Sequence, residues 1–157
     1  MIIVLMGVSG SGKSTIGEPL AARLGLPFLD ADEFHPPANV AKMAAGTPLT
    51  DADRLPWLKL LNEKLRALPD AVLACSALKE SYRQSLSSDI PDCRFVYLRG
   101  SIELIRSRLT DRKHRYMPAS LLASQFATLE PPRDAIEVDI GRGVAECVDE
   151  IAARLGR

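Results

Sequence analysis

Short apolar runs and helical stripes alternate along the chain, and this alternation is the first guide to its fold. Residues 1–6 form an apolar, partly β-branched run typical of a strand buried on both faces of a parallel sheet. Residues 26–29, 71–75 and 95–98 are similar runs, and residues 136–140 alternate between apolar and polar side chains. The pattern predicts a strand at each of these places.

Apolar residues at helical spacing fill the stretches between the predicted strands. The predicted helices cover residues 14–24, 38–45, 54–68, 82–86, 102–109, 118–129 and 144–155. Gly25 suits a left-handed cap at the end of the first helix. We expect Asp53 to be the N-cap of the third, with Pro56 in its first turn. Alternating strands and helices predict an α/β fold with a parallel sheet and right-handed crossovers.

Residues 7–14 follow the first predicted strand and match the phosphate-binding pattern G-x-x-x-x-G-K-[S/T] at every required position. A Gly/Ser-rich turn between a strand and a helix is alternatively just a tight connection. The full pattern in the right context favours nucleotide binding, because glycines let successive N–H groups converge on phosphate oxygens at a helix N-terminus. The expected ATP-binding residues are Gly7, Val8, Ser9, Gly10, Ser11, Gly12, Lys13, Ser14 and Thr15.

Within this loop, two side chains are suited to the chemistry of a nucleotide. Lys13 can bridge the terminal phosphates as a point charge, which makes it a candidate catalytic residue. Ser14 carries a hydroxyl suited to Mg²⁺.

Length and charge narrow the class of protein. At 157 residues, the chain is expected to form one domain, residues 1–157. It has 20 basic and 20 acidic residues, so no global field attracts it to nucleic acid or to a membrane. Its three cysteines are widely separated and odd in number, which argues against a disulfide framework and suits a reducing compartment. We therefore expect a cytoplasmic protein that binds neither nucleic acid nor membranes.

Polar residues accumulate where the predicted strands end, which is where α/β sheets bind ligands. Asp30 and Asp32 follow the second strand, and Ser76 and Lys79 follow the third. Phosphoryl transfer needs a magnesium ion and a group that orients or deprotonates the acceptor hydroxyl, and the two aspartates are the candidates. We expect both carboxylates on one face of extended chain. The alternative is that they form a turn or a helix cap.

A basic run covers residues 106–115. It fits a solvated helix face, a nucleic-acid patch, or a lid that brings cations to a triphosphate and excludes water. Neutral overall charge and the lack of interleaved aromatic residues argue against nucleic acid. We place a helical lid at about residues 112–118 and assign Arg112 to the phosphates, with Lys113 and Arg115 as the other lid cations.

Several longer motifs accompany the phosphate loop. They are Asp-Ala-Asp at residues 30–32, His-Pro at 35–36 with Asn39, Lys-Met at 42–43, Gly-Thr-Pro-Leu at 46–49, Asp-Ala-Asp-Arg at 51–54, Pro-Trp-Leu at 56–58, Cys-Ser-Ala-Leu-Lys at 75–79 with Tyr-Arg at 82–83, and Ser-Gln-Phe-Ala-Thr-Leu-Glu-Pro at 124–131. Together with the loop, these motifs resemble one family, the small bacterial gluconokinases, which are relatives of shikimate kinase and the nucleoside monophosphate kinases. The resemblance covers essentially the whole chain.

This resemblance implies ATP-dependent phosphorylation of the 6-hydroxyl of D-gluconate, with Mg²⁺. It also implies a P-loop three-layer α/β/α fold with five parallel strands, a lid over the nucleotide, and often a homodimer. By similarity, Asp32 would accept or orient the substrate hydroxyl, and Asp30 would hold magnesium through water. The implied substrate-binding residues are Asp32, His35, Arg54, Ser76, Lys79, Arg83 and Gln125.

Two other functions fit the phosphate loop. One is a kinase of the same architecture that acts on a shikimate-like or nucleotide acceptor. The other is a nucleotide-dependent switch that has no acceptor.

Overall fold

The computed structural model describes residues 1–110 and 119–157. Its centre is a five-stranded parallel sheet in the order β2-β3-β1-β4-β5. The strands are β1 (Ile2–Met6), β2 (Phe28–Asp30), β3 (Ala71–Ala74), β4 (Cys93–Arg99) and β5 (Ile136–Asp139). The five predicted strands and their parallel arrangement are confirmed.

Helices separate the strands, as the apolar spacing predicts. They are α1 (Lys13–Leu24), the short 3-10 helix η1 (Ala31–Phe34), α2 (Pro37–Ala44), α3 (Asp51–Arg66), α4 (Glu80–Ser87), α5 (Ile102–Thr110), α6 (Ala119–Thr128) and α7 (Val144–Arg154). None of those in the described part of the chain is long and apolar enough to cross a membrane.

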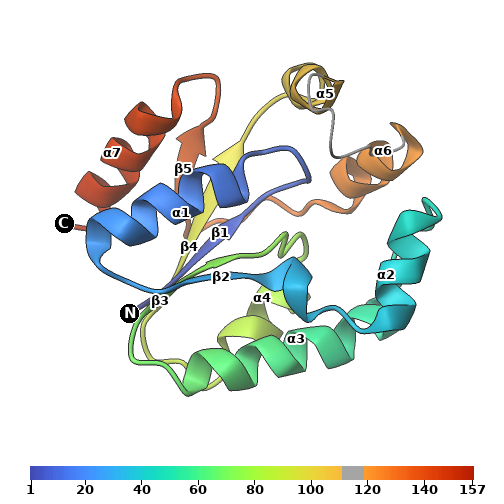
Figure 1. The fold of residues 1–157 in the computed structure, drawn as a ribbon, viewed down its shortest axis with the longest axis horizontal. Coiled ribbons are helices and arrows are strands. Elements are labelled where there is room, and N and C mark those ends of the chain that lie inside the picture. Colours follow the sequence, from blue (N-terminus) through green and yellow to red (C-terminus); the bar gives the residue numbers. More distant parts are fainter. Residues whose placement is uncertain (111–118) are drawn as a thin grey trace.

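The central strand β1 sends alternate side chains to the two faces of the sheet, and both faces are covered. Ile3 and Leu5 belong to one apolar cluster, with residues of α1 and α7. Ile2 and Val4 belong to a second cluster, with residues of α3 and α4. Figure 1 shows α1 and α7 over one face of the sheet and α3 and α4 under the other. This is the predicted three-layer α/β/α arrangement.

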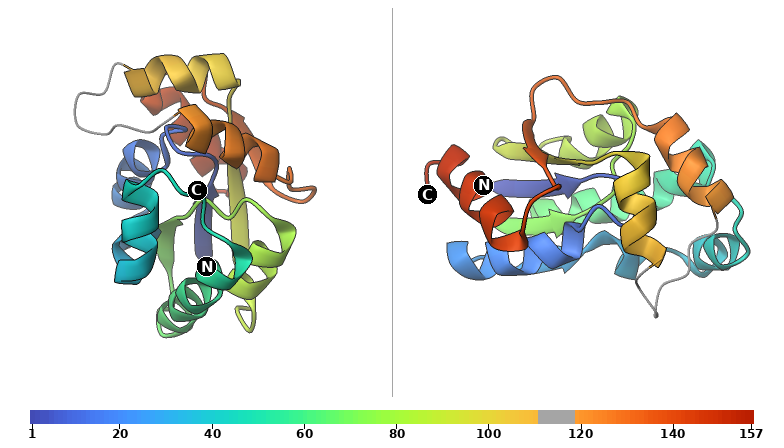
Figure 2. Two further views of the ribbon diagram at one scale, coloured as in Figure 1. Left: turned by 90° about the vertical axis from the view of Figure 1, so that its right-hand side faces the viewer. Right: turned by 90° about the horizontal axis from the view of Figure 1, so that it is seen from above.

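All strands run the same way, so their carboxyl ends share one edge of the sheet. In register, Ile2 of β1 lies opposite Ala71 of β3 on one side and Cys93 of β4 on the other. The two views of Figure 2 place α2, α5 and α6 around the edge at which these strands end. The loops that follow β1, β2 and β3 therefore open toward the same helices.

The start of α3 differs from the prediction. Thr50, rather than Asp53, is the N-cap: its hydroxyl accepts a hydrogen bond from the Asp53 N–H at 3.1 Å. The Asp53 carboxylate in turn accepts the Thr50 N–H at 2.9 Å, which completes a capping box. The helix therefore starts earlier than predicted, and Pro56 lies beyond its first turn.

Candidate functional site

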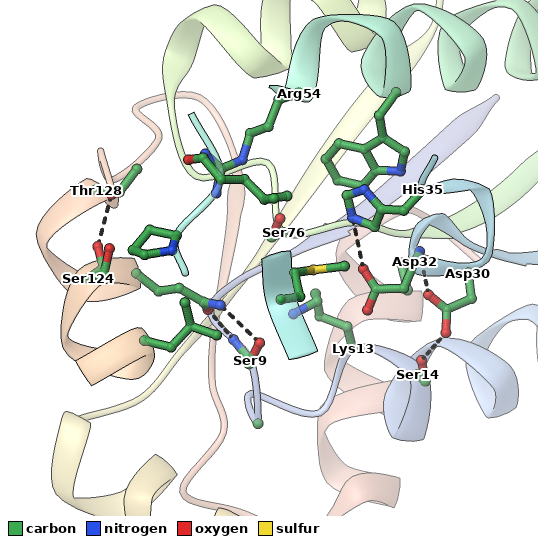
Figure 3. A pocket seen from close by; sticks show the side chains of 18 of the residues that line it. Ser9, Lys13, Ser14, Asp30, Asp32, His35, Arg54, Ser76, Ser124 and Thr128 are labelled. Atoms are coloured by element: carbon green, nitrogen blue, oxygen red, sulfur yellow. Dashed lines mark hydrogen bonds and ion pairs between the residues drawn. The ribbon is translucent and has the colours of Figure 1, made fainter. Parts of the chain in front are cut away.

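A cavity of about 530 Å³ lies at the carboxyl edge of the sheet. Its walls come from the loop after β1, the end of β2, η1, the start of α3 and one side of α6 (Figure 3). Most of the predicted site residues line it: Ser9, Gly10, Gly12, Lys13, Ser14, Thr15, Asp30, Asp32, His35, Arg54, Ser76 and Gln125. Segments far apart in the sequence thus contribute to one site.

The phosphate loop has the backbone that its glycines permit. Gly10 and Gly12 have φ of 82° and 95°, and α1 begins directly afterwards at Lys13. The Lys13 ammonium donates to the carbonyls of Gly7 and Val8, each at 3.0 Å. These bonds hold the lysine against its own loop, so its charge lies beside the N-terminus of α1.

A chain of hydrogen bonds joins the phosphate loop to the two aspartates. Ser14 Oγ donates to Asp30 Oδ2 at 3.3 Å, and the Asp32 backbone N–H donates to Asp30 Oδ1 at 3.0 Å (Figure 3). The prediction of extended chain here is wrong, because Asp30 caps η1 and Asp32 lies within that turn. Both carboxylates nevertheless line the same cavity.

His35 lies between Asp32 and the start of α3. Its side chain is only 3% exposed, and its ring stacks on the Trp57 indole with centroids 4.0 Å apart. Its Nε2 lies 3.7 Å from Asp32 Oδ1, and its Nδ1 lies 3.2 Å from the Asn39 side-chain nitrogen. Burial lowers the pKa of His35, with Asp32 acting in the opposite direction.

Arg54 gives the cavity a cation on the α3 side. Its Nη1 donates to the Leu49 carbonyl at 2.6 Å and to the Tyr82 hydroxyl at 3.2 Å. Its guanidinium carbon also lies 5.1 Å from the centre of the Tyr82 ring. These contacts fix the arginine while its other nitrogens carry no hydrogen bond to the described residues, so they remain available to an anionic ligand.

Lys79 and Arg83 do not line the cavity. Lys79 is paired with Asp51 at 3.1 Å, and that hydrogen bond raises the pKa of Lys79. Arg83 is 4% exposed and donates to the Ala77 carbonyl at 2.8 Å and the Glu130 carbonyl at 2.9 Å. The structure therefore gives Arg83 a role in joining α4 to the chain after α6.

Gln125 does line the cavity, but its amide is bonded to the phosphate loop. The Ser9 N–H donates to Gln125 Oε1 at 2.7 Å, and Gln125 Nε2 donates to Ser9 Oγ at 3.1 Å. Ser76 lies nearby, just after β3, and its carbonyl accepts the Gly7 N–H at 3.2 Å. Arg112 and the predicted lid at 112–118 lie outside the described residues.

Two residues that contact His35 carry no predicted role, although each stands out in the sequence. Asn39 is 3% exposed and stands four residues after His35, a spacing that places two side chains on one face of a turn. Trp57 is the single tryptophan of the chain, and its ring stacks against that of His35. Its indole N–H donates to the Ala31 carbonyl at 2.8 Å, which ties α3 to η1.

A phosphate loop, a nearby carboxylate and a cation around one cavity, on this parallel sheet, define the class of P-loop kinases. In agreement, a family model described as shikimate kinase matches residues 9–129. A solved shikimate kinase from Aquifex aeolicus, 23% identical, has the same fold with a TM-score of 0.61 over 99% of this chain and 96% of that chain.

More similar relatives narrow the class. A gluconokinase of Gluconobacter oxydans is 53% identical over 84% of this chain and 76% of its own length. The thermosensitive gluconokinase of Escherichia coli is 41% identical over 94% of this chain and 83% of its own length. A solved gluconokinase from Sinorhizobium meliloti is 46% identical, with a TM-score of 0.93 over 99% of this chain and 91% of that chain. The chain belongs to the gluconokinase family.

Proposed function

We propose that this protein transfers the γ-phosphoryl group of ATP to the 6-hydroxyl of D-gluconate. The observation that carries the proposal is that Lys13, Asp32 and Arg54 come from three different elements and line one cavity. They supply, in that order, a cation for the phosphates, a base for a hydroxyl and a cation for a carboxylate. The gluconokinase relatives support this choice of acceptor.

The nucleotide end of the cavity is the loop after β1. Its N–H groups and the N-terminus of α1 favour the phosphates of ATP, and Lys13 would exchange its bonds to the Gly7 and Val8 carbonyls for phosphate oxygens. The side-chain amide of Gln125 is hydrogen-bonded to the N–H and hydroxyl of Ser9. Gln125 would therefore move away from Ser9 when the phosphates of ATP bind there.

Ser14 and Asp30 fit a magnesium ion that accompanies ATP. Their oxygens lie 3.3 Å apart beside the phosphate loop, and both are hard oxygen donors. No group of three or more His, Cys, Asp or Glu side chains in the described residues suits a metal. This fits Mg²⁺, which keeps several waters and uses few protein ligands. The bound ion would neutralise charge that develops on the phosphate oxygens.

At the acceptor end, Asp32 would take the proton of the 6-hydroxyl. As that oxygen attacks the γ-phosphorus, the bond from phosphorus to the β,γ-bridging oxygen breaks, and ADP leaves with the electron pair. Arg54 would bind the gluconate carboxylate through the nitrogens that carry no hydrogen bond to the described residues. Ser76 and His35 line the same space and can contact the polyol.

A coupled assay with ATP and Mg²⁺ tests this function on a panel of gluconate, shikimate, other sugar acids and nucleoside monophosphates. We expect gluconate to give the highest kcat/KM. Asp32→Asn should abolish most of this turnover while ATP binding persists, because the change removes the base and leaves the loop intact. Preference for another acceptor would overturn the proposed substrate, and full activity of Asp32→Asn would overturn the role of Asp32.

A further inference from the structure

The Asp32 side chain is 69% exposed, and the hydrogen bond that anchors the residue goes through its backbone N–H to Asp30. The His35 ring lies beside this carboxylate, with Nε2 3.7 Å from Asp32 Oδ1 (Figure 3). An acceptor-activating base must be held in a narrow orientation, since small misplacements are costly in rate.

The hydrogen bonds of Asn39 determine which nitrogen of His35 carries the proton. The Asn39 side-chain nitrogen lies 3.0 Å from the Asp53 carbonyl and 3.2 Å from His35 Nδ1. A backbone carbonyl only accepts hydrogen bonds, so this Asn39 atom is the amide nitrogen, which has two hydrogens to donate. His35 Nδ1 is therefore the acceptor of the second one. In the neutral ring, the proton is then on Nε2, the nitrogen that faces Asp32.

The surroundings of His35 favour that neutral ring. Burial lowers the pKa of His35 and Arg54 lowers it further, whereas Asp32 and Asp30 raise it. A neutral N–H can orient a carboxylate by hydrogen bonding. An imidazolium would also stabilise the ionised carboxylate and so make it a weaker base.

His35 is itself rigidly held. The Trp57 ring lies nearly parallel to it, at an interplanar angle of 16°, and the Trp57 indole N–H is bonded to the Ala31 carbonyl. On the other side, Asn39 is fixed by the carbonyl of Asp53, which belongs to the capping box of α3. The Nε2–H direction is thus set by the Trp57 ring of α3 and by Asn39 of α2, whose amide is anchored to α3.

We propose that His35 is a positioning residue, which directs its Nε2–H at Asp32 and so fixes this carboxylate toward the acceptor hydroxyl. The inference rests on the proposed function. The separation of 3.7 Å shortens to a hydrogen bond when the substrate is bound, as is common for catalytic contacts that tighten in the reactive complex.

Two substitutions separate the N–H group from the packing of the ring. His35→Phe keeps an aromatic ring on Trp57 but has no N–H, whereas His35→Gln loses the stacking and keeps an amide N–H at a similar reach. We expect His35→Phe to lower kcat on gluconate about 10- to 100-fold, the scale of a misplaced catalytic group. The KM for ATP should not change. His35→Gln should recover much of the kcat despite its poorer packing.

A purely structural role predicts the opposite order, with Gln worse than Phe, and that result would overturn the inference. Melting temperatures of both variants identify any loss of folded protein. Full wild-type turnover together with a fully active His35→Phe would overturn this inference alone. A wild-type protein without turnover on any acceptor would overturn both the inference and the proposed function.

The tautomer gives a second readout that does not depend on turnover. The chain has two histidines, so imidazole ¹⁵N signals are assigned by their loss in His35→Gln. We expect the Nε2–H pattern for His35 in the wild type, and a change of this pattern in Asn39→Asp, whose carboxylate would attract the proton to Nδ1. An Nδ1–H pattern in the wild type would overturn the assigned geometry.

Discussion

Lys13 and Arg54 are both cations that line the cavity, but their present partners differ in kind. Lys13 is bonded to two carbonyls of its own loop, which phosphate oxygens can replace. Arg54 is held through one nitrogen by Leu49 and Tyr82, so its remaining donors have a fixed direction before any ligand arrives. A side chain that is already oriented loses less entropy when it binds.

Lys13→Ala should lower kcat by about 100- to 1,000-fold, the scale of removing one preorganised donor at a reacting centre. The coupled assay at saturating gluconate and ATP measures this loss. Lys59→Ala, on the exposed surface of α3, removes the same charge elsewhere and should leave kcat unchanged. Near-normal turnover of Lys13→Ala would contradict the role given to Lys13.

Arg54 and Arg83 should respond differently to substitution. Arg54→Lys loses the planar guanidinium that suits a carboxylate, so we expect the KM for gluconate to rise about 10-fold or more. Arg83→Leu leaves the Ala77 and Glu130 carbonyls without their donor, so we expect it to lower the free energy of unfolding by about 1–3 kcal/mol.

Steady-state kinetics and urea unfolding of both variants measure these effects. Arg83→Leu should change the KM for gluconate less than twofold. A large rise in that KM with unchanged stability would show that Arg83 contacts the substrate after all.

At this scale the sequence predicts charge and motif but not how each charge is used. The phosphate-binding function of residues 7–14 can be predicted from the sequence, because it depends on local backbone geometry. The hydrogen-bond partners of Arg83 cannot be predicted in this way, because the Glu130 carbonyl lies 47 residues away in the sequence. The hydrogen bond between Ser9 and Gln125 joins residues 116 positions apart, so the sequence does not predict it either.

Among the elements, the start of α3 both stabilises the fold and supports the residues of the candidate site. Its capping box holds Asp53, which pairs with Lys42 of α2 at 2.7 Å and presents its carbonyl to Asn39. Thr50 and Asp53 are both good N-cap residues three positions apart, so local pattern alone does not decide between them. The reciprocal hydrogen bonds between Thr50 and Asp53 show that Thr50 is the N-cap.

The hydrogen bond from Lys42, with those from Thr50, lowers the pKa of Asp53 from 3.8 to about 2. A carboxyl whose pKa is depressed on folding stabilises the protein above its unfolded pKa, and this contribution is lost as the pH falls through the folded pKa. We therefore expect Asp53→Asn to have a lower melting temperature than the wild type at pH 5 to 7. The difference should shrink as the pH falls from about 4 toward 2.

Melting curves at several pH values check this prediction. Glu63→Gln, an exposed substitution on the same helix, serves as the control and should show no such convergence. A gap between wild type and Asp53→Asn that is constant with pH would mean that the ion pair with Lys42 does not contribute.

For the whole molecule, the alternation of strands and helices is enough to predict a parallel α/β sheet. Strand order is a different matter, because β1 pairs with β3 and β4 rather than with its neighbour in sequence, β2. No local pattern contains that information. The lid, expected from the basic run, and the homodimer, implied by resemblance to a family, remain predictions.

ATP should stabilise the whole fold, since its site is made from loops that only the assembled sheet brings together. At a concentration 100 times its dissociation constant, a ligand of the native state adds about 2.7 kcal/mol. We expect a clear rise in melting temperature with Mg²⁺ and a non-hydrolysable ATP analogue, and a much smaller rise in Lys13→Ala. An equal rise in both proteins would place the nucleotide elsewhere.

The position of β1 in the sheet has a consequence for the protein during synthesis. β1 leaves the ribosome before both of its partners, because β3 and β4 begin about 70 and 90 residues later in the chain. At about 5–20 residues per second, its five apolar residues stay without a sheet for several seconds. The nascent chain thus exposes an apolar, aggregation-prone strand before it is able to bind a nucleotide.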